Sequence, residues 1–294
     1  KYKFNRKAVY STEPINQKWN GLAQHVAAVV IDNTDTVILT VFTSLTDVSI
    51  YSVYHLVVYG IKNIFMVISN GIQALLGELW AKKDEDLRET FEWTEWITHA
   101  FVVLAFGCTG VLIIPFVKVY TNGVNDANYI QPLFSAILVL AHAFHCLRLP
   151  YHMMIKASGH YKETQSCYMI AASINVVLSV ISVFALGLLG VAIGTLIAML
   201  YQTIWMAIYN SKHLIKRNIQ SFIKQIVVDV ITIIIGIRCT NWLQLNEVSY
   251  LAWFKLAVIV GAIWMIIVIV INTVAYKKRM IQLIRISKKR IIRR

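Results

Sequence analysis

The stretch INVVLSVISVFALGLLGVAIGTLIAMLYQTIW, residues 174–205, contains no charged side chain. A helix needs about 20 mostly apolar residues to cross the hydrocarbon core of a bilayer. This stretch therefore predicts parts of two membrane spans, over residues 164–186 and 188–209, joined by a turn so short that the spans form a helical hairpin. Gly190 and Gly194 form a GxxxG pattern, which permits close contact between membrane helices.

Further apolar segments extend on both sides of this hairpin. Hydrophobic residues make up 57% of the 294-residue chain and charged residues only 15%, whereas a soluble domain has about 25% charged residues. The mean hydropathy is +0.61. We therefore predict an all-α polytopic membrane protein with eight transmembrane helices and exclude a soluble protein. The other six spans are expected over residues 22–44, 48–76, 94–117, 130–152, 222–241 and 251–275.

The positions of lysine and arginine predict the orientation of these helices. Of the 28 basic residues, 24 lie in the N-terminal segment, in the connections after every second span and the adjoining span ends, or in the C-terminal tail. The opposite side holds only Lys118, Arg238 and Lys255, and Lys62 lies within the second span. Because cytoplasmic connections are enriched in Lys and Arg, both ends are predicted to be cytoplasmic. This distribution accounts for the net charge of +13, so we expect no nucleic-acid partner.

Three charged residues lie within the first two spans. Asp32 and Asp35 are three residues apart and share a helix face, and Lys62 lies near the middle of the second span. A charge at the centre of a membrane helix costs about 2.5–3.5 kcal/mol on insertion scales, so such residues usually face a cavity or a partner. Two interpretations stay open and can coexist: an internal ion pair between an aspartate and Lys62, or a cation or proton site at the aspartates.

Polar residues in the 174–205 hairpin extend this pattern. Asn175 and Thr195 are expected at a similar height in the membrane to Asp35. Oxygen ligands of this kind suit a hard cation such as Na⁺, although such residues also form plain interhelical hydrogen bonds. No catalytic motif is present, and the four cysteines form no CxxC pair. We therefore expect no catalytic residue, no bound metal cofactor and no enzymatic activity, apart from coupling to Na⁺ or H⁺.

Several stretches in a fixed order resemble the carboxy-terminal part of Wzx-type polysaccharide flippases, over about residues 15–275. These transporters belong to the multidrug/oligosaccharidyl-lipid/polysaccharide exporter superfamily and have a MATE-like fold of two six-helix lobes around a central cavity. The resemblance is carried by NTDTVILTVF (33–42), IYSVYHLV (50–57), PFVKVYTNGVNDANYIQPLF (115–134), KASGHYKETQ (156–165) and the opening stretch (174–205).

The resemblance implies a domain organisation. Residues 1–20 would form a cytoplasmic linker between lobes, and residues 21–210 the six-helix second lobe. Residues 211–276 would contribute two additional transmembrane helices, and residues 277–294 a basic cytoplasmic tail. The first lobe would be missing from this chain. The tail, rich in Lys, Arg and Ile, is interpreted either as an orientation signal or as an amphipathic segment on an anionic leaflet.

The resemblance also implies an activity: moving polyprenyl-pyrophosphate-linked oligosaccharide across the bacterial inner membrane for O-antigen or capsule synthesis. The implied partners are the lipid-linked oligosaccharide, membrane lipids, a polysaccharide polymerase and a chain-length regulator. Related lipid II flippases carry a sodium site on the first, fifth and sixth helices of the second lobe, and matching residue types here are Asp32 or Asp35, Asn175 and Thr195. The pyrophosphate would meet Lys62 and, at the cytoplasmic mouth, Arg148 and Lys156.

Other functions remain as alternatives. A cation-coupled multidrug exporter would have the same fold. A membrane-embedded polymerase or glycosyltransferase usually needs a large outer loop or an acidic catalytic motif, and the outer connections here are short. A non-transporting scaffold would be insensitive to substitutions of the polar residues within the spans.

Overall fold

The computed structural model describes residues 18–292, which fold into helices without a β-strand. Seven helical segments in this range are long and apolar enough to cross a membrane, with α4 and α5 counted as one segment. The chain is a multi-pass all-α membrane protein. The helices are α1 (Lys18–Phe42), α2 (Leu45–Lys82), α3 (Leu87–Tyr120), α4 (Pro132–Leu147), α5 (Leu149–Ser158), α6 (Tyr161–Leu186), α7 (Leu188–Tyr209), α8 (Gln220–Thr240), α9 (Tyr250–Ala275) and α10 (Lys277–Ile292).

Each of the eight predicted spans coincides with helical structure. The fourth span is divided at Arg148 because Pro150, the second residue of α5, has no backbone N–H with which to continue the hydrogen-bond ladder. The predicted span over 222–241 coincides with α8, which carries Lys224, Asp229 and Arg238. This helix is not among the seven long apolar segments, so the eighth crossing stays a prediction.

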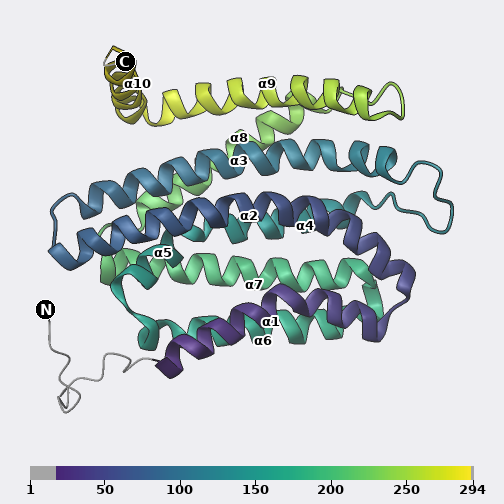
Figure 1. Cartoon of the computed structure of the whole chain (residues 1–294), viewed down its shortest axis with the longest axis horizontal. Coiled ribbons are helices and arrows are strands. Elements are labelled where there is room, and N and C mark those ends of the chain that lie inside the picture. Colours follow the sequence, from purple (N-terminus) through teal and green to yellow (C-terminus); the bar gives the residue numbers. More distant parts are fainter. Residues whose placement is uncertain (1–17, 293–294) are drawn as a thin grey trace, which may run out of the picture.

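The long helices lie side by side along the long axis of the molecule (Figure 1). α1 begins and α9 ends at the same end of the molecule, on the left in the figure, where α2 also passes into α3. In an antiparallel bundle with an even number of helices, the first helix begins at the end of the bundle where the last helix ends. The assignment of this end to the cytoplasm stays a prediction.

The first six spans, α1 to α7, form what we call the six-span bundle. α6 packs against both α1 and α7, α4 packs between α7 and α3, and α2 lies along α4 and α5. α3 also contacts α8 and α9, which lie on its outer side (Figure 1). The domain boundaries expected at residues 21–210 and 211–276 are compatible with this layout but stay predictions.

Short polar caps and one glycine produce the tight hairpins. Ser44 Oγ accepts a hydrogen bond of 3.2 Å from the Asp47 backbone N–H, and the Asp47 carboxylate accepts one from the Ser44 N–H, which forms a capping box. This cap lets α2 start three residues after α1 ends. At the α6–α7 turn, Gly187 has φ of +54°, in the left-handed region that favours glycine.

The GxxxG pattern brings α6 and α7 into close contact, as predicted. A Cβ atom on Gly190 would overlap the backbone of Ser182, and one on Gly194 would overlap Ser179. The absence of both side chains lets the two backbones approach. As a result, the polar face of α6 lies directly against the polar face of α7, which carries Thr195.

A second small-residue contact docks the C-terminal helices on the six-span bundle. Trp264 of α9 is fully buried, and its ring occupies the space that side chains on Gly107 of α3 and Gly236 of α8 would need. Nearby, Trp96 Nε1 donates a hydrogen bond of 2.8 Å to Asn272 Oδ1. α8 and α9 are therefore held against α3 by shape as well as by hydrogen bonds.

We expect Gly107→Ala to destabilise the protein by about 1–3 kcal/mol, because the added Cβ would displace the Trp264 ring. The matched control is Gly110→Ala on the same helix, where the nearest atom to the new Cβ is Val139 Cγ1 at 4.0 Å. The control should leave stability unchanged or raise it by up to about 1 kcal/mol, since alanine favours helix. Thermal unfolding in detergent measures both, and equal midpoints for the two variants would contradict the expected overlap.

The two ends of the chain carry the predicted linker and the predicted basic tail. The predicted linker over residues 1–20 lies outside the described residues except for its last three. The predicted basic tail over 277–294 is helical over Lys277–Ile292, and its axis turns away from that of α9 (Figure 1). Arg279 links it to the start of α3 through an ion pair with Glu92, at 2.9 Å. Neither the orientation role nor the leaflet-binding role expected of the tail is tested by this geometry.

Candidate functional site

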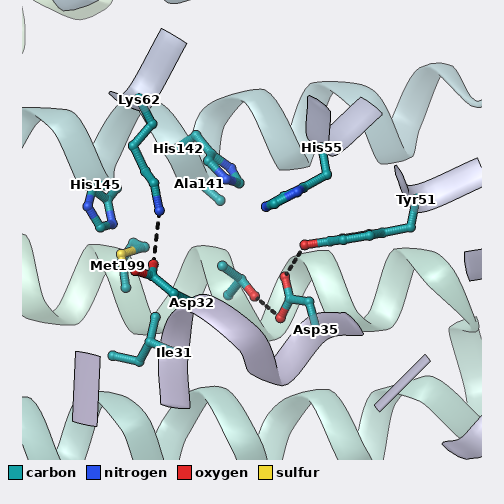
Figure 2. Close-up of a pocket in the computed structure, with 11 residues that line it drawn as sticks. Ile31, Asp32, Asp35, Tyr51, His55, Lys62, Ala141, His142, His145 and Met199 are labelled. Atoms are coloured by element: carbon teal, nitrogen blue, oxygen red, sulfur yellow. Dashed lines mark hydrogen bonds and ion pairs between the residues drawn. The ribbon is translucent and has the colours of Figure 1, made fainter. Parts of the chain in front are cut away.

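A small pocket lies between α1, α2, α4 and α7, and acidic and basic side chains point into it (Figure 2). Its volume of about 20 Å³ has room for about one water molecule or one unhydrated cation. A sugar does not fit in it. The lining residues are Ile31, Asp32, Asp35, Tyr51, His55, Lys62, Ala141, His142, His145, Thr195 and Met199.

Asp35 is the buried acid of the pocket, with 3% of the residue exposed. Its Oδ1 accepts a hydrogen bond of 2.7 Å from Thr195 Oγ1, and its Oδ2 accepts one of 3.3 Å from the Tyr51 hydroxyl (Figure 2). Both donors are neutral. Within residues 18–292, Asp35 has no ion-pair partner, so its negative charge is buried without a compensating cation.

More oxygen atoms surround Thr195. Asn175 Nδ2 donates a hydrogen bond of 2.9 Å to Thr195 Oγ1, and the hydroxyls of Ser179 and Thr195 each lie 3.3 Å from the Val191 carbonyl oxygen. Asn175 Oδ1 is buried and has no hydrogen-bond partner among the described residues. Two close-packed helices and α1 thus bring carboxylate, amide, hydroxyl and carbonyl oxygens together, which is the donor set of a hard cation.

The two aspartates of α1 have different partners. Lys62 Nζ lies 3.0 Å from Asp32 Oδ1, and the Asp32 side chain is 43% exposed, whereas that of Lys62 is 6% exposed (Figure 2). Residues three apart differ by about 60° around a helix, so Asp35 faces α7 while Asp32 faces the pocket opening. The structure therefore contains the ion pair, at Asp32, whereas the cation or proton site stays a prediction with Asp35 as its candidate.

Histidines form a wall of the pocket that the sequence analysis did not assign to the site. His55 stacks against Tyr51 and Tyr59, each with ring centroids 5.1 Å apart, and its ring lies 5.7 Å from that of His142. His142 Nδ1 is 3.0 Å from the Leu138 carbonyl oxygen. Among residues 18–292, no group of three or more His, Cys, Asp or Glu side chains is arranged to hold a metal ion.

The position of Arg148 corrects an expectation. The sequence placed it at the cytoplasmic mouth, but the structure buries it between α4 and α7 with 6% of the residue exposed. It donates a hydrogen bond to Gln202, and its Nη2 lies 3.3 Å from His145 Nε2. Its Nε has no partner, and no carboxylate in the described part of the chain forms an ion pair with it. This burial differs from the open position expected at the mouth, and the role of Arg148 toward the pyrophosphate stays a prediction.

Arg148 belongs to a basic stripe along one face of α4 and α5. Its members recur every three or four residues and are His142, His145, Arg148, His152 and Lys156. Lys156 is half-buried at the end of α5 nearest the connection to α6. A buried cation without an acid is costly unless another anion compensates it. The recurring spacing was the signal that could have identified this stripe from the sequence.

The comparisons with known proteins support the fold. No protein-family model matches this sequence, and no curated protein matches it either. A solved structure described as "Lipid II flippase MurJ, inward closed conformation" superposes with a TM-score of 0.62 at 15% sequence identity. The superposition covers 93% of this chain and 57% of that chain, so this chain spans little more than half of it. The six-span bundle with its two following helices thus shares the fold of this part of that structure.

Proposed function

We propose that this chain is part of a transporter that moves a lipid-linked anionic oligosaccharide across a membrane, coupled to a cation at Asp35. The observation that carries the proposal is a pair of opposite buried charges. Asp35 is a buried acid without a cation, and Arg148 is a buried base without an acid, within one six-span bundle. A protein retains such groups at a cost, and in membrane helices they usually mark ion or substrate pathways.

The buried acid Asp35 and the oxygen atoms around it support ion coupling. A Na⁺ ion in the small pocket would take oxygen ligands from Asp35, Thr195 and Asn175, with Ser179 and the Val191 carbonyl close by. A proton on Asp35 would neutralise the same charge, so the coupling ion is Na⁺ or H⁺. Moving one charge across 100 mV supplies about 2.3 kcal/mol, which is enough to bias a conformational equilibrium by a factor of roughly 50.

The basic residues of the bundle support an anionic substrate. Lys62, Arg148 and Lys156 are the proposed ligands for the pyrophosphate of a polyprenyl-linked oligosaccharide. Because the pocket holds only about 20 Å³, the sugar has to bind in another conformation, in which this bundle rocks against a second lobe. The proposed setting is the bacterial inner membrane, where O-antigen or capsule synthesis would supply the substrate and a polymerase and chain-length regulator would act on the product.

The experiment is the sidedness of polyprenyl-linked sugars in cells that lack the protein. We expect the repeat unit to accumulate on the cytoplasmic leaflet and restoration of the gene to reverse this. Lys62→Ala should restore transport at least about tenfold less well, because it removes a buried cation and leaves Asp32 unpaired. The matched control is Lys118→Ala, which removes an exposed lysine near the C-terminal end of α3.

The outcomes separate the alternatives. Unchanged sidedness with an intact surface glycan would contradict lipid-linked oligosaccharide transport and favour a cation-coupled drug exporter. Full activity of Lys62→Ala would remove this residue from the substrate path. Insensitivity of transport to every substitution in the pocket would favour a scaffold.

A further inference from the structure

A second buried polar cluster lies outside the pocket, where α3, α5 and α8 meet the connection between α7 and α8. It is independent of the residues proposed for transport. Its charged and titratable members are almost completely buried, and its carboxylates come from two different helices. The cluster comprises Glu95 and His99 of α3, Tyr151 of α5, Arg217 of the connection, and Gln225 and Asp229 of α8.

In one half of the cluster, the charges of Arg217 and Glu95 compensate each other. Both terminal nitrogens of the Arg217 guanidinium group donate hydrogen bonds to the Glu95 carboxylate, one of them at 2.6 Å to Oε2. The Tyr151 hydroxyl donates a hydrogen bond of 2.6 Å to Glu95 Oε1. A phenol has one proton to donate, and here Glu95 takes it.

The other half is arranged so that a doubly protonated imidazole can donate from both ring nitrogens. His99 Nδ1 lies 2.6 Å from Asp229 Oδ2, and His99 Nε2 lies 3.5 Å from the Tyr151 oxygen. The carboxylate accepts hydrogen bonds, and the Tyr151 oxygen can only accept here because its proton points to Glu95. Both ring nitrogens therefore face acceptors. With an imidazolium at His99, the charges of Glu95, Arg217, His99 and Asp229 cancel within the buried cluster.

We propose that His99 and Asp229 form a proton-binding site that holds α8 against the six-span bundle. The bound proton makes His99 the cation that compensates Asp229, which is 5% exposed and, within residues 18–292, otherwise receives only a hydrogen bond of 3.3 Å from Gln225. Loss of the proton leaves a carboxylate on α8 buried without a cation, which is costly for as long as α8 stays docked. The site thus couples proton occupancy to the docking of α8.

Each element around His99 contributes a group that affects this equilibrium. Glu95 faces it from α3 and Tyr151 from α5, while Arg217 faces Glu95 from the connection. Asp229 comes from α8, and the phenol of Tyr276, after α9, is close enough to interact with the Asp229 charge. Because an unprotonated His99 leaves the buried Asp229 without a cation, docking of α8 weakens when the site loses its proton.

The protonation state is tested by NMR of the full chain in lipid nanodiscs with ¹⁵N-labelled histidine. His99→Gln identifies the signal, because it removes one of the eight histidines. We expect both ring nitrogens of His99 to carry protons at pH 7 in the wild type and the ring to become neutral in Asp229→Asn. The matched control is Asp126→Asn in the exposed α3–α4 loop, which should leave the signal unchanged. A neutral His99 ring in the wild type at pH 7 would overturn the proposal, whether or not Asp229→Asn folds.

Docking of α8 is tested by hydrogen–deuterium exchange, with rates corrected for the intrinsic effect of pH. Peptides from α8 should lose protection by at least about tenfold between pH 6 and pH 9 in the wild type, while α6 peptides keep theirs. The double variant His99→Gln/Asp229→Asn, which has no charge at either position, should show no such pH dependence. Equal pH dependence of α8 protection in the wild type and the double variant would refute the coupling. Transport activity enters neither readout, so failure of the proposed function leaves this test intact.

Discussion

Asp35→Asn is expected to abolish cation-coupled transport while the protein still inserts and folds. Asparagine has the size of aspartate, and its oxygen can accept the hydrogen bond from Thr195, but it carries no charge. A cation in the pocket loses its one buried counter-charge, which costs about 3 kcal/mol, or roughly 100-fold in affinity. The measurements are surface glycan in cells at native expression and the Na⁺-dependent shift in thermal unfolding of the purified protein.

The design includes controls for charge, folding and the nature of the ion. Asp126→Asn makes the same chemical change in an exposed loop and should behave as the wild type. Thr195→Val removes the hydroxyl that donates a hydrogen bond to Asp35 and that would be a ligand of Na⁺. It should therefore weaken a Na⁺ response while leaving coupling to protons largely intact. A normal surface glycan in Asp35→Asn would show that this carboxylate does not couple transport to either ion.

Arg217→Met is expected to produce the largest loss of stability among single substitutions at ion pairs. Burial by itself would lower the pKa of Arg217, but hydrogen bonds and the negative charge of Glu95 raise the pKa above its usual value. Removal of the guanidinium leaves Glu95 buried at 3% exposure, with the Tyr151 hydroxyl as its one remaining partner in the part of the chain that the structure describes. Breaking a buried pair in this way costs about 3–5 kcal/mol. The readouts are the thermal midpoint and the monodisperse fraction in detergent.

Two comparison variants decide the cause of that loss. Arg88→Met breaks an exposed pair of 3.1 Å with Glu92, four residues away, and should cost at most about 1 kcal/mol. The double variant Glu95→Gln/Arg217→Met removes both charges and keeps a hydrogen-bond acceptor for Tyr151, so it should recover most of the stability. If the double variant is no more stable than Arg217→Met, the loss reflects packing of the Arg217 side chain, which also lies over the Phe91 ring at 5.1 Å.

The positions of the helices could be predicted from the sequence because membrane spans are a one-dimensional signal. A run of apolar residues long enough to cross a bilayer is visible without knowledge of any partner, and the charged residues that interrupt it stand out against it. Asp35, Lys62, Asn175 and Thr195 were identified in this way, and the structure brings all four to one side of the bundle interior. The glycines at 190 and 194 likewise predicted the close α6–α7 contact.

The pairing of these residues was decided only by the tertiary structure. The sequence could not determine which aspartate meets Lys62, because that depends on the rotation of α1 by about 60° relative to its neighbours. It could not show that Arg148 is buried against Gln202 of α7, because that contact depends on how α4 packs against α7. Glu95 and Arg217 are 122 residues apart, and His99 and Asp229 are 130 apart. Their contacts arise because α8 returns across α3. The local pattern of residues does not determine which helix a buried side chain will face.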